Sequence, residues 1–373
     1  MSESSGASPD TLSSNRLTGA LRPGLAFSGG IIVITLIALL VLVLLALILS
    51  ETPGRTLFFF FAGPFRNVFS FGNMLNNMIP LILGGLGVSI AMQTGNLNLG
   101  GEGQIYSGAF VATIIAIALA PLGQFGGFIA ILAGAFFAGA VAAVSGFCKA
   151  RWETNELITT FLLSHALILI VNYFVNGPFL DPETNLQATR RIPDAFRLSL
   201  ILRPSNLSTA LLLALIAVFA VHVFLKNTKL GYEFRMAGAN EMFARYGGIN
   251  IKRNTVLAMF FSGAMYGLAG SIMIFGTFHR TIREFSAGLG WDGLATALVA
   301  GFYPPALIPS GFFFAWISSG ARIAMQNSDI TFEIAAVVQA VILFLATSLV
   351  LRNMFLRNSF RRNGFRHKKR RQP

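Results

Sequence analysis

Long uninterrupted runs of apolar residues alternate with short polar stretches along most of this chain. The run Ile31–Leu49 contains no charged residue, and similar runs recur as far as residue 351. Runs of about twenty apolar residues are long enough for a helix to cross a bilayer, and they lack the polar–apolar alternation of barrel strands. We therefore expect an all-α, polytopic membrane protein with about ten transmembrane helices, some of them broken or re-entrant.

The apolar runs divide the chain into spans, loops and tails. The expected spans are about Ile31–Leu49, Asn73–Gln93, Glu102–Ala120, Phe125–Phe147, Thr154–Val175, Leu207–Leu225, Thr255–Phe278, a short span from Gly288, Ala306–Ala324 and Ile330–Leu351. Pro304 and Pro305 indicate a broken helix at the end of the short span. We expect a flexible tail at 1–28, one transmembrane domain at 29–352 and a basic tail at 353–373.

Charge is scarce in this chain, and its cations are unevenly placed. Charged residues make up 12% of the sequence, whereas soluble domains carry about 25%. The cations behind the net charge of +13 gather in both tails, at 149–151 and in the polar loop 227–254. Such clusters mark the cytoplasmic side of a membrane protein, where anionic lipid attracts them, so we expect membrane lipid and no nucleic acid as a partner.

An even number of spans leaves both termini on the same side of the membrane. With the basic loop, they are expected in the cytoplasm, beneath a bacterial inner membrane. The stretches Glu51–Gly72 and Asn176–Pro204 then become external loops.

The polar loop 227–254 lies between two apolar runs. We expect two short helices in it, near Tyr232–Ala237 and from Asn240 onward. Asn240 is a favourable N-cap, and Gly247 ends the second helix. An exposed apolar cluster on a loop between membrane spans needs a partner. The second helix carries such a cluster, formed by Met242, Phe243 and Tyr246.

A second polar stretch, TGNLNLGGEGQ at 94–104, interrupts an apolar context. Non-helical backbone is tolerated at membrane depth only where protein buries it or where it lines a cavity. Its polar side chains therefore have two interpretations: they hydrogen-bond a polar solute in transit, or they satisfy the backbone of a broken helix. The side chains concerned are Asn96, Asn98, Glu102 and Gln104.

A third stretch, GLGWDG at 288–293, matches the pattern G-x-G-x-x-G, but it follows no expected strand, so we exclude dinucleotide binding. Trp291 beside Asp292 is a polar–aromatic pair suited to a heterocycle with hydroxyl groups. The alternative is that Asp292 is an ordinary acidic residue at a helix N-terminus. Transporters built from repeated broken helices bind solute at the breaks, so we expect the solute between the second and third stretches.

Several enzyme classes are excluded. The chain has no G-x-x-x-x-G-K-[ST] phosphate loop, no G-x-S-x-G elbow and no H-E-x-x-H metal motif. Cys148 is the only cysteine, which rules out an internal disulfide and a thiolate metal cage. We therefore predict no enzymatic activity and no catalytic, cofactor-binding or metal-binding residue, and energy for transport must come from a partner or an ion gradient.

Four sets of residues in this chain match sequence patterns of one known protein family. They are Thr228, Gly231, Arg235, Gly238, Asn240, Ala244 and 246–249 in the loop; Asn98, Gly100, Glu102, Gly103 and Gln104; the segment 288–301; and Asn155, Glu156, Asn172 and Tyr173 in the fifth span. Together they resemble the permease subunits of bacterial ABC importers, in the sugar and nucleoside permease family and its nucleoside-type branch. Within the fifth span, we expect Glu156 to cap the helix.

The resemblance implies the transmembrane subunit of an ATP-driven ABC importer that moves a nucleoside or similar small neutral solute into the cytoplasm. It also implies three protein partners: an ABC ATPase subunit, a second permease subunit, homologous or identical, and a substrate-binding lipoprotein. The ATPase-coupling residues are then Arg235, Gly238, Asn240, Met242, Phe243, Tyr246 and Gly247. The substrate pathway is assigned to Asn96, Asn98, Glu102, Gln104, Trp291 and Asp292.

Three alternatives stay open. In the first, the solute is riboflavin or a simple sugar instead of a nucleoside, because related permeases carry these solutes. In the second, the chain is a proton-coupled carrier, whose uptake follows pH and ignores ATP. A multi-span membrane enzyme is the alternative from another class, although an enzyme has no need of the apolar cluster on the loop.

Overall fold

The structure is a computed structural model that describes residues 50–329 without a break, together with single positions between 40 and 48 and between 340 and 344. Apart from these single positions, the expected first and tenth spans lie outside the described residues, as do both tails. The chain divides into two compact units, and nearly all the described residues belong to the first. This unit is Gly54–Asp329, and the second is Met1–Pro53 with Ile330–Pro373.

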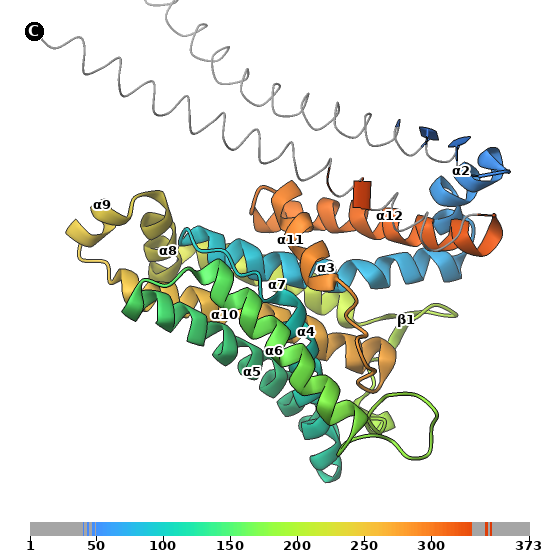
Figure 1. The fold of residues 1–373 in the computed structure, drawn as a ribbon, viewed down its shortest axis with the longest axis horizontal. Coiled ribbons are helices and arrows are strands. Elements are labelled where there is room, and N and C mark those ends of the chain that lie inside the picture. The colour runs from blue at the N-terminus through green and yellow to red at the C-terminus, as the bar shows by residue number, and fades with distance from the viewer. Residues whose placement is uncertain are drawn as a thin grey trace, which may run out of the picture. The chain divides into compact units, whose positions relative to one another are not determined.

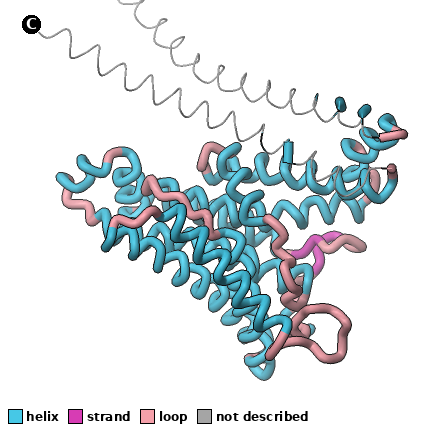
Figure 2. The backbone as a smooth tube through the Cα atoms, in the orientation of Figure 1, coloured by secondary structure: helices cyan, strands magenta, loops and turns pink. Residues whose placement is uncertain are grey.

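Helices make up nearly all the regular structure of the first unit (Figures 1 and 2). They are α2 (Pro53–Phe61), α3 (Val68–Gln93), α4 (Gly101–Ala118), α5 (Gly123–Trp152), α6 (Glu156–Asn176), α7 (Ala210–Asn227), α8 (Lys229–Ala239), α9 (Glu241–Tyr246), α10 (Ile251–Met273), α11 (Leu289–Val299) and α12 (Leu307–Asn327). A π-helix, Ile274–Phe278, continues α10. The short strands β1 (Leu200–Leu202) and β2 (Leu207–Ser208) pair antiparallel.

Five described helices, α3, α5, α6, α7 and α10, are long and apolar enough to cross a membrane, and α11 with α12 gives a sixth span if that bent pair counts as one. The two helices of the pair meet at 116°, which confirms the break expected at Pro304. The predicted all-α, multi-pass architecture is confirmed. α4 is not among the five, because Glu102 and Gln104 make its first turn polar.

The structure differs from the sequence expectation at Glu51–Gly72, which holds a helix as well as loop. α2 ends in four consecutive phenylalanines, and its C-terminus packs on α12. There the Trp316 Nε1–H donates a hydrogen bond to the Phe61 carbonyl oxygen at 3.1 Å. At nine residues, α2 is too short for the apolar periodicity of a span, so the sequence pattern did not indicate it.

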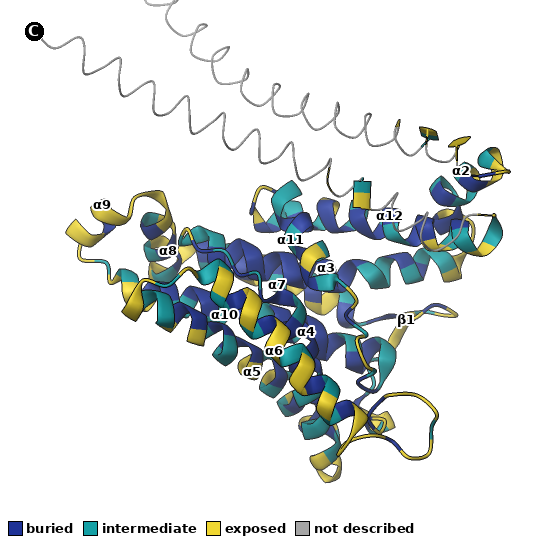
Figure 3. Cartoon of the chain, in the orientation of Figure 1, coloured by how far each residue is buried: buried dark blue, intermediate teal, exposed yellow. Residues whose placement is uncertain are grey.

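Helices α3, α4 and α10 are the most buried, whereas α5 and α6 each expose a face (Figure 3). Helices α4, α5 and α10 touch at backbone distance. A Cβ on Gly108 of α4 would lie 2.6 Å from the Cα of Gly267 of α10, and a Cβ on Gly134 of α5 would lie 2.4 Å from the Gly108 carbonyl oxygen. Such distances leave no room for a side chain. Small residues therefore set how closely these helices pack, as in other membrane bundles.

Between the π-helix and α11 the backbone is not helical. Residues 279–288, here called the re-entrant segment, run back along α4. The contacts between the two, in the order of the segment, are Thr281 with Thr113, Glu284 with Tyr106, and Gly288 with Glu102. The residue numbers of the α4 partners fall as those of the segment rise. The segment therefore runs antiparallel to α4 and brings α11 to the start of that helix.

Candidate functional site

The two short helices α8 and α9 lie together at one end of the bundle, as expected for the loop 227–254 (Figure 1). Thr228 Oγ1 accepts a hydrogen bond from the Gly231 N–H at 3.1 Å, at the start of α8. Asn240 Oδ1 accepts one from the Phe243 N–H at 3.0 Å, at the start of α9. The two predicted helices and the N-cap at Asn240 are therefore confirmed.

Helix α9 presents three apolar side chains to its surroundings. The exposed fractions are 69% for Met242, 61% for Phe243 and 87% for Tyr246. Arg245 forms an ion pair of 2.6 Å with Glu241 one turn earlier, which adds modest support to a very short helix. The geometry is that of an apolar cluster held on a capped helix, and a surface of this kind suits contact with another protein.

Helix α8 faces inward instead. A Cβ on its residue Gly238 would lie 2.2 Å from the carbonyl oxygen of Gln93, the last residue of α3. Arg235 turns the other way and donates from Nη2 to the Lys226 carbonyl oxygen at 3.4 Å. Gly238 thus places the loop in direct contact with the beginning of the polar break at 94–104, while α9 remains exposed.

Within that break, Asn98 is a buried hydrogen-bonding centre. Its Oδ1 accepts from the Gly100 N–H at 2.9 Å, and its Nδ2 donates to Gln104 Oε1 at 2.8 Å and to Ser262 Oγ of α10 at 3.1 Å. The side chains of Asn98 and Gln104 are almost completely buried. Of the two interpretations left open by the sequence, this arrangement favours satisfaction of the broken backbone at these two positions.

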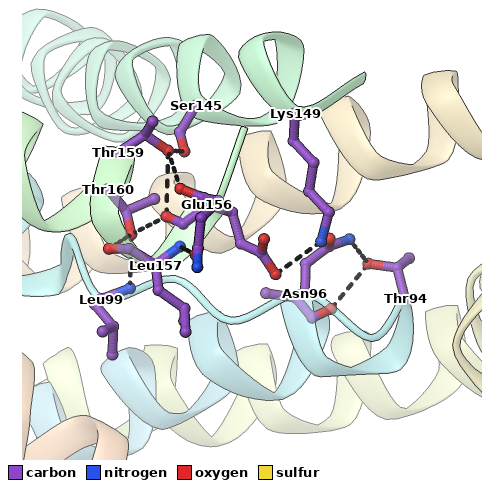
Figure 4. A network of polar contacts seen from close by, with 11 residues as sticks. Thr94, Asn96, Leu99, Ser145, Lys149, Glu156, Leu157, Thr159 and Thr160 are labelled. Atoms are coloured by element: carbon purple, nitrogen blue, oxygen red, sulfur yellow. Dashed lines mark hydrogen bonds and ion pairs between the residues drawn. The ribbon is translucent and has the colours of Figure 1, made fainter. Parts of the chain in front are cut away.

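Helix α6 satisfies two further donors of the break. Thr160 Oγ1 accepts from the Leu99 N–H at 3.1 Å, and Ser164 Oγ accepts from the Gly103 N–H at 2.8 Å. Thr160 and Ser164 are one helical turn apart, so one face of α6 follows the break. Figure 4 shows Leu99 beside Thr160 in this network.

The start of α6 differs from the sequence expectation. Asn155, rather than Glu156, is the N-cap, because its side chain accepts a hydrogen bond from a backbone N–H two residues later. Glu156 forms an ion pair of 2.8 Å with Lys149 at the end of α5 (Figure 4). Asn96, also drawn there, is buried and donates from Nδ2 to Thr94 Oγ1 at 2.6 Å.

Glu102 joins the two polar stretches that the sequence analysis singled out. Its Oε1 accepts from the Gly288 N–H at 3.1 Å, and its Oε2 accepts from the Gly290 N–H at 2.9 Å. A Cβ on Gly290 would lie 2.3 Å from the Glu102 backbone nitrogen, so the starts of α4 and α11 touch. A carboxylate in this position also interacts favourably with the dipole of α11.

Trp291 and Asp292 follow directly in the first turn of α11. The Trp291 side chain is 47% exposed, and its ring lies 6.3 Å from the ring of Phe161 on α6, measured between centroids. Asp292 is only partly exposed and interacts electrostatically with Glu102 and with Arg322 of α12. Trp291 is therefore the most exposed of the six predicted pathway residues, and the other five are partly or fully covered.

Sequence reasoning missed the part of α6 that faces Trp291. His165 is exposed there, and its ring centroid lies 4.3 Å from that of Phe161. One ionisable side chain in the middle of an apolar span was the available signal. Within residues 50–329, no group of three or more His, Cys, Asp or Glu side chains is placed to hold a metal ion.

At the end opposite α9, the loop 177–199 is fixed to the re-entrant segment. The Thr189 N–H donates to the Thr281 carbonyl oxygen at 2.9 Å, and Arg280 lies 3.6 Å from Asp181 in a nearly buried ion pair. This loop therefore forms an ordered cover over one end of α4 and α10.

The sequence was compared with known proteins. Residues 70–347 match the family described as "Branched-chain amino acid transport system / permease component". The "Probable riboflavin import permease protein RfuC" of Treponema pallidum (strain Nichols) is 34% identical, over 80% of this chain and 80% of its own length. The "Guanosine ABC transporter permease protein NupP" of Bacillus subtilis (strain 168) is 27% identical, over 78% of this chain and 84% of its own.

A third relative, the "Glucose ABC transporter permease protein TsgB13" of Haloferax volcanii, is 31% identical over 85% of this chain and 86% of its own length. These relatives are transporter permeases rather than enzymes. The family match, the shares of both chains covered and the multi-pass helical fold agree with the resemblance carried by the loop and the two polar stretches. The chain is an ABC transporter permease subunit, and it belongs to the family of branched-chain amino acid transport system permease components.

Proposed function

We propose that this permease is part of an ATP-driven importer that carries a nucleoside or a similar small neutral solute into the cytoplasm. The proposal rests on one observation: Glu102, in the polar break at 94–104, holds the start of the helix that presents Trp291. A half-exposed aromatic ring beside hydrogen-bonding groups suits a neutral heterocycle. The guanosine permease among the relatives supports the same solute class.

In this proposal, the solute passes between the break at 94–104 and the first turn of α11. Asn98 and Gln104 support the path by holding the broken backbone of 94–104 in place. Asn96 does the same at the beginning of this stretch. Glu102 fixes the spacing of the two helix starts, and Trp291 with Asp292 stands nearest to the solute.

Helix α9 docks on a separate ABC ATPase subunit through Met242, Phe243 and Tyr246. The exposure of these side chains supports a protein partner, and the contact of Gly238 with Gln93 gives its movement a direct route to the break. Asn240 and Gly247 set the two ends of α9, and Arg235 ties α8 back to α7. The ATPase supplies the energy that this chain does not generate.

The α8–α9 end and both termini lie in the cytoplasm, beneath a bacterial inner membrane, with anionic lipid around the basic residues. The loop 177–204 at the opposite end faces a substrate-binding lipoprotein. Arg190, Arg191 and Arg203 in this loop form no ion pair with any described residue, so they are available to acidic groups of that partner. A second permease subunit, identical or homologous, completes the importer.

Uptake into proteoliposomes tests the proposal. The permease, reconstituted with its ATPase and binding protein, is given labelled guanosine, riboflavin or ribose with ATP present or absent. We expect ATP-dependent guanosine uptake. Riboflavin is the second candidate, because RfuC shares 34% identity with this chain. Riboflavin or ribose uptake without guanosine uptake would overturn the solute assignment, and uptake independent of ATP would overturn the mechanism.

A further inference from the structure

We propose that Phe161, His165 and Trp291 form a solute-binding site halfway through the membrane, and that the site takes a flat, neutral heterocycle bearing an N–H or O–H donor. The inference deepens the proposed function and depends on it. It differs from the pathway expected from the sequence, because two of the three residues lie on α6.

His165 stands near the middle of a membrane span. α6 has 21 residues, so its length of about 31 Å matches a hydrocarbon core of about 30 Å. His165 lies about 14 Å from the start of the helix and is exposed. An ionisable side chain at this depth is costly in lipid, and its default interpretation is a functional site.

The hydrogen bonding of His165 determines what it offers to a solute. Its Nδ1 lies 3.1 Å from the Phe161 carbonyl oxygen, which can only accept, so Nδ1 carries the proton of the neutral ring. Nε2 is then an acceptor, and it has no hydrogen-bond partner in the part of the chain that the structure describes. A donor on a nucleobase, a ribose or an isoalloxazine ring satisfies it.

Two aromatic rings lie on this part of the surface: the Phe161 ring is 4.3 Å from the His165 ring, and the Trp291 ring is 6.3 Å from that of Phe161, measured between centroids. The Phe161 side chain is 38% exposed and comes from α6, whereas Trp291 comes from α11, and their rings are inclined at 63° to each other. Aromatic faces of this kind stack on flat heterocycles with little dependence on the identity of the base. Ring stacking and the single acceptor together favour a heterocycle over a sugar.

The same face of α6 is polar towards the re-entrant segment, which argues against lipid as its neighbour. Asn172 lies three turns beyond Phe161 on this face, and its Nδ2 donates to Glu284 Oε1 at 3.0 Å. Glu284 also pairs with Arg283 at 3.5 Å, and its side chain is 59% exposed. Non-helical backbone beside exposed charges needs protein or water. A water-filled path that leads to His165 meets that need.

Transport kinetics of the reconstituted complex test the site. We expect Trp291→Ala and Phe161→Ala to raise the KM for guanosine at least tenfold, with the ATPase still bound. His165→Ala is expected to raise it several-fold, and His165→Gln, which restores an acceptor, to recover most of the loss. Ile170→Ala is the matched control, because Ile170 is exposed on the opposite face of α6. An unchanged KM in both Trp291→Ala and His165→Ala would overturn the site.

A second measurement needs no transport and separates failure of the site from failure of the function. In a Cys148→Ser background, His165→Cys in the assembled complex is treated with a water-soluble thiol reagent. We expect it to react and guanosine or riboflavin to slow the reaction, whereas Ile170→Cys is expected to stay unreactive. An inert His165→Cys means that a second permease packs dry against this face, and the site is then wrong. If riboflavin protects and guanosine does not, the site stands and the nucleoside assignment falls.

Discussion

The carboxylate of Glu102 accepts a hydrogen bond of 2.9 Å from the backbone N–H of Gly290, a residue 188 positions further along the chain. Its other oxygen accepts from the Gly288 N–H at 3.1 Å. One side chain therefore uses both oxygens to hold the beginning of α11 against the beginning of α4. Any movement that separates the two helices must break both hydrogen bonds.

Replacement of Glu102 tests this link. In Glu102→Gln, one carboxylate oxygen becomes an N–H₂ group, which faces a backbone N–H and cannot accept from it. A hydrogen bond to a charged group contributes about 1.5–3 kcal/mol, so we expect solute uptake to fall about tenfold or more. Initial uptake rates check this, with Glu183→Gln in an exposed loop as the control. Equal rates for the two variants would contradict the assignment.

Gly238 and Gly54 differ in the room around them. A Cβ on Gly238 would meet the Gln93 carbonyl oxygen at 2.2 Å, whereas a Cβ on Gly54 of α2 would stand in open space. We expect Gly238→Ala to push α8 away from α3 and to lower the amount of solute moved per ATP hydrolysed. Gly54→Ala is expected to behave as wild type. A normal transport-to-hydrolysis ratio in Gly238→Ala would show that the contact is not used.

The exposed apolar cluster gives the prediction for assembly. Phe243→Asp with Tyr246→Asp places two charges in a desolvated contact, so we expect loss of ATPase co-purification while the permease still inserts in the membrane. Leu186→Asp is the control, because Leu186 is also exposed but lies in the loop at the opposite end. Pull-down from detergent extracts measures the effect, and full recovery of the ATPase with the double variant would remove α9 as its docking site.

Labelling at the α9 end and in the loop at the opposite end tests the orientation of the protein in the membrane. In a Cys148→Ser background, Arg245→Cys on α9 and Leu186→Cys in the opposite loop are treated with a membrane-impermeant thiol reagent outside intact spheroplasts. The concentration of cations near α9 predicts that it lies inside, so only Leu186→Cys is expected to react. Labelling of Arg245→Cys from outside would invert the topology.

His279, where the chain leaves the π-helix, gives a pH prediction. Burial, followed by the guanidinium groups of Arg197 and Arg191, lowers the pKa of His279 below its ordinary value. The unfolded chain then binds this proton at a higher pH than the folded chain. The free energy of unfolding is therefore expected to decrease as the pH falls through the ordinary histidine pKa of about 6.5 and on towards the lowered folded-state pKa.

Thermal unfolding in detergent from about pH 7.5 to about pH 5.5 measures this decrease. The control variant is His279→Asn, because asparagine tolerates the left-handed φ of 58° at this position and does not titrate. We expect a smaller loss of Tm in the variant than in the wild type, and an identical loss in both would assign the pH dependence to other groups.

The sequence predicted the elements well wherever local chemistry decides them. The fifth span was expected at Thr154–Val175 and is found at Glu156–Asn176, because its apolar run is long and polar residues bound it. The error at its start has a local cause. Asn155 and Glu156 are both favourable first residues, and only the backbone shows that Asn155 is extended, with φ −73° and ψ 115°.

Which residues form the candidate site depends on packing between distant parts of the chain, and no local sequence pattern predicts that packing. Asn98 is buried because Ser262, 164 positions later, supplies the partner of its amide. Likewise, the closeness of Phe161 to Trp291 depends on the re-entrant segment, which lies against both α4 and α6. Sequence spacing identified polar residues in apolar surroundings, but it could not tell which of them point inward.

The glycine contacts among α4, α5 and α10 have a mechanical consequence. Helices that touch backbone to backbone cannot slide past one another without a clash, so we expect these three to move as a single rigid body during transport. The same close packing holds α6 and the start of α11, because a Cβ on Gly103 of α4 would lie 2.3 Å from the Ser164 carbonyl oxygen of α6, and a Cβ on Gly290 of α11 would lie 2.3 Å from the Glu102 backbone nitrogen. In the proposed mechanism, the solute path therefore opens by movement of these helices together against the second permease subunit.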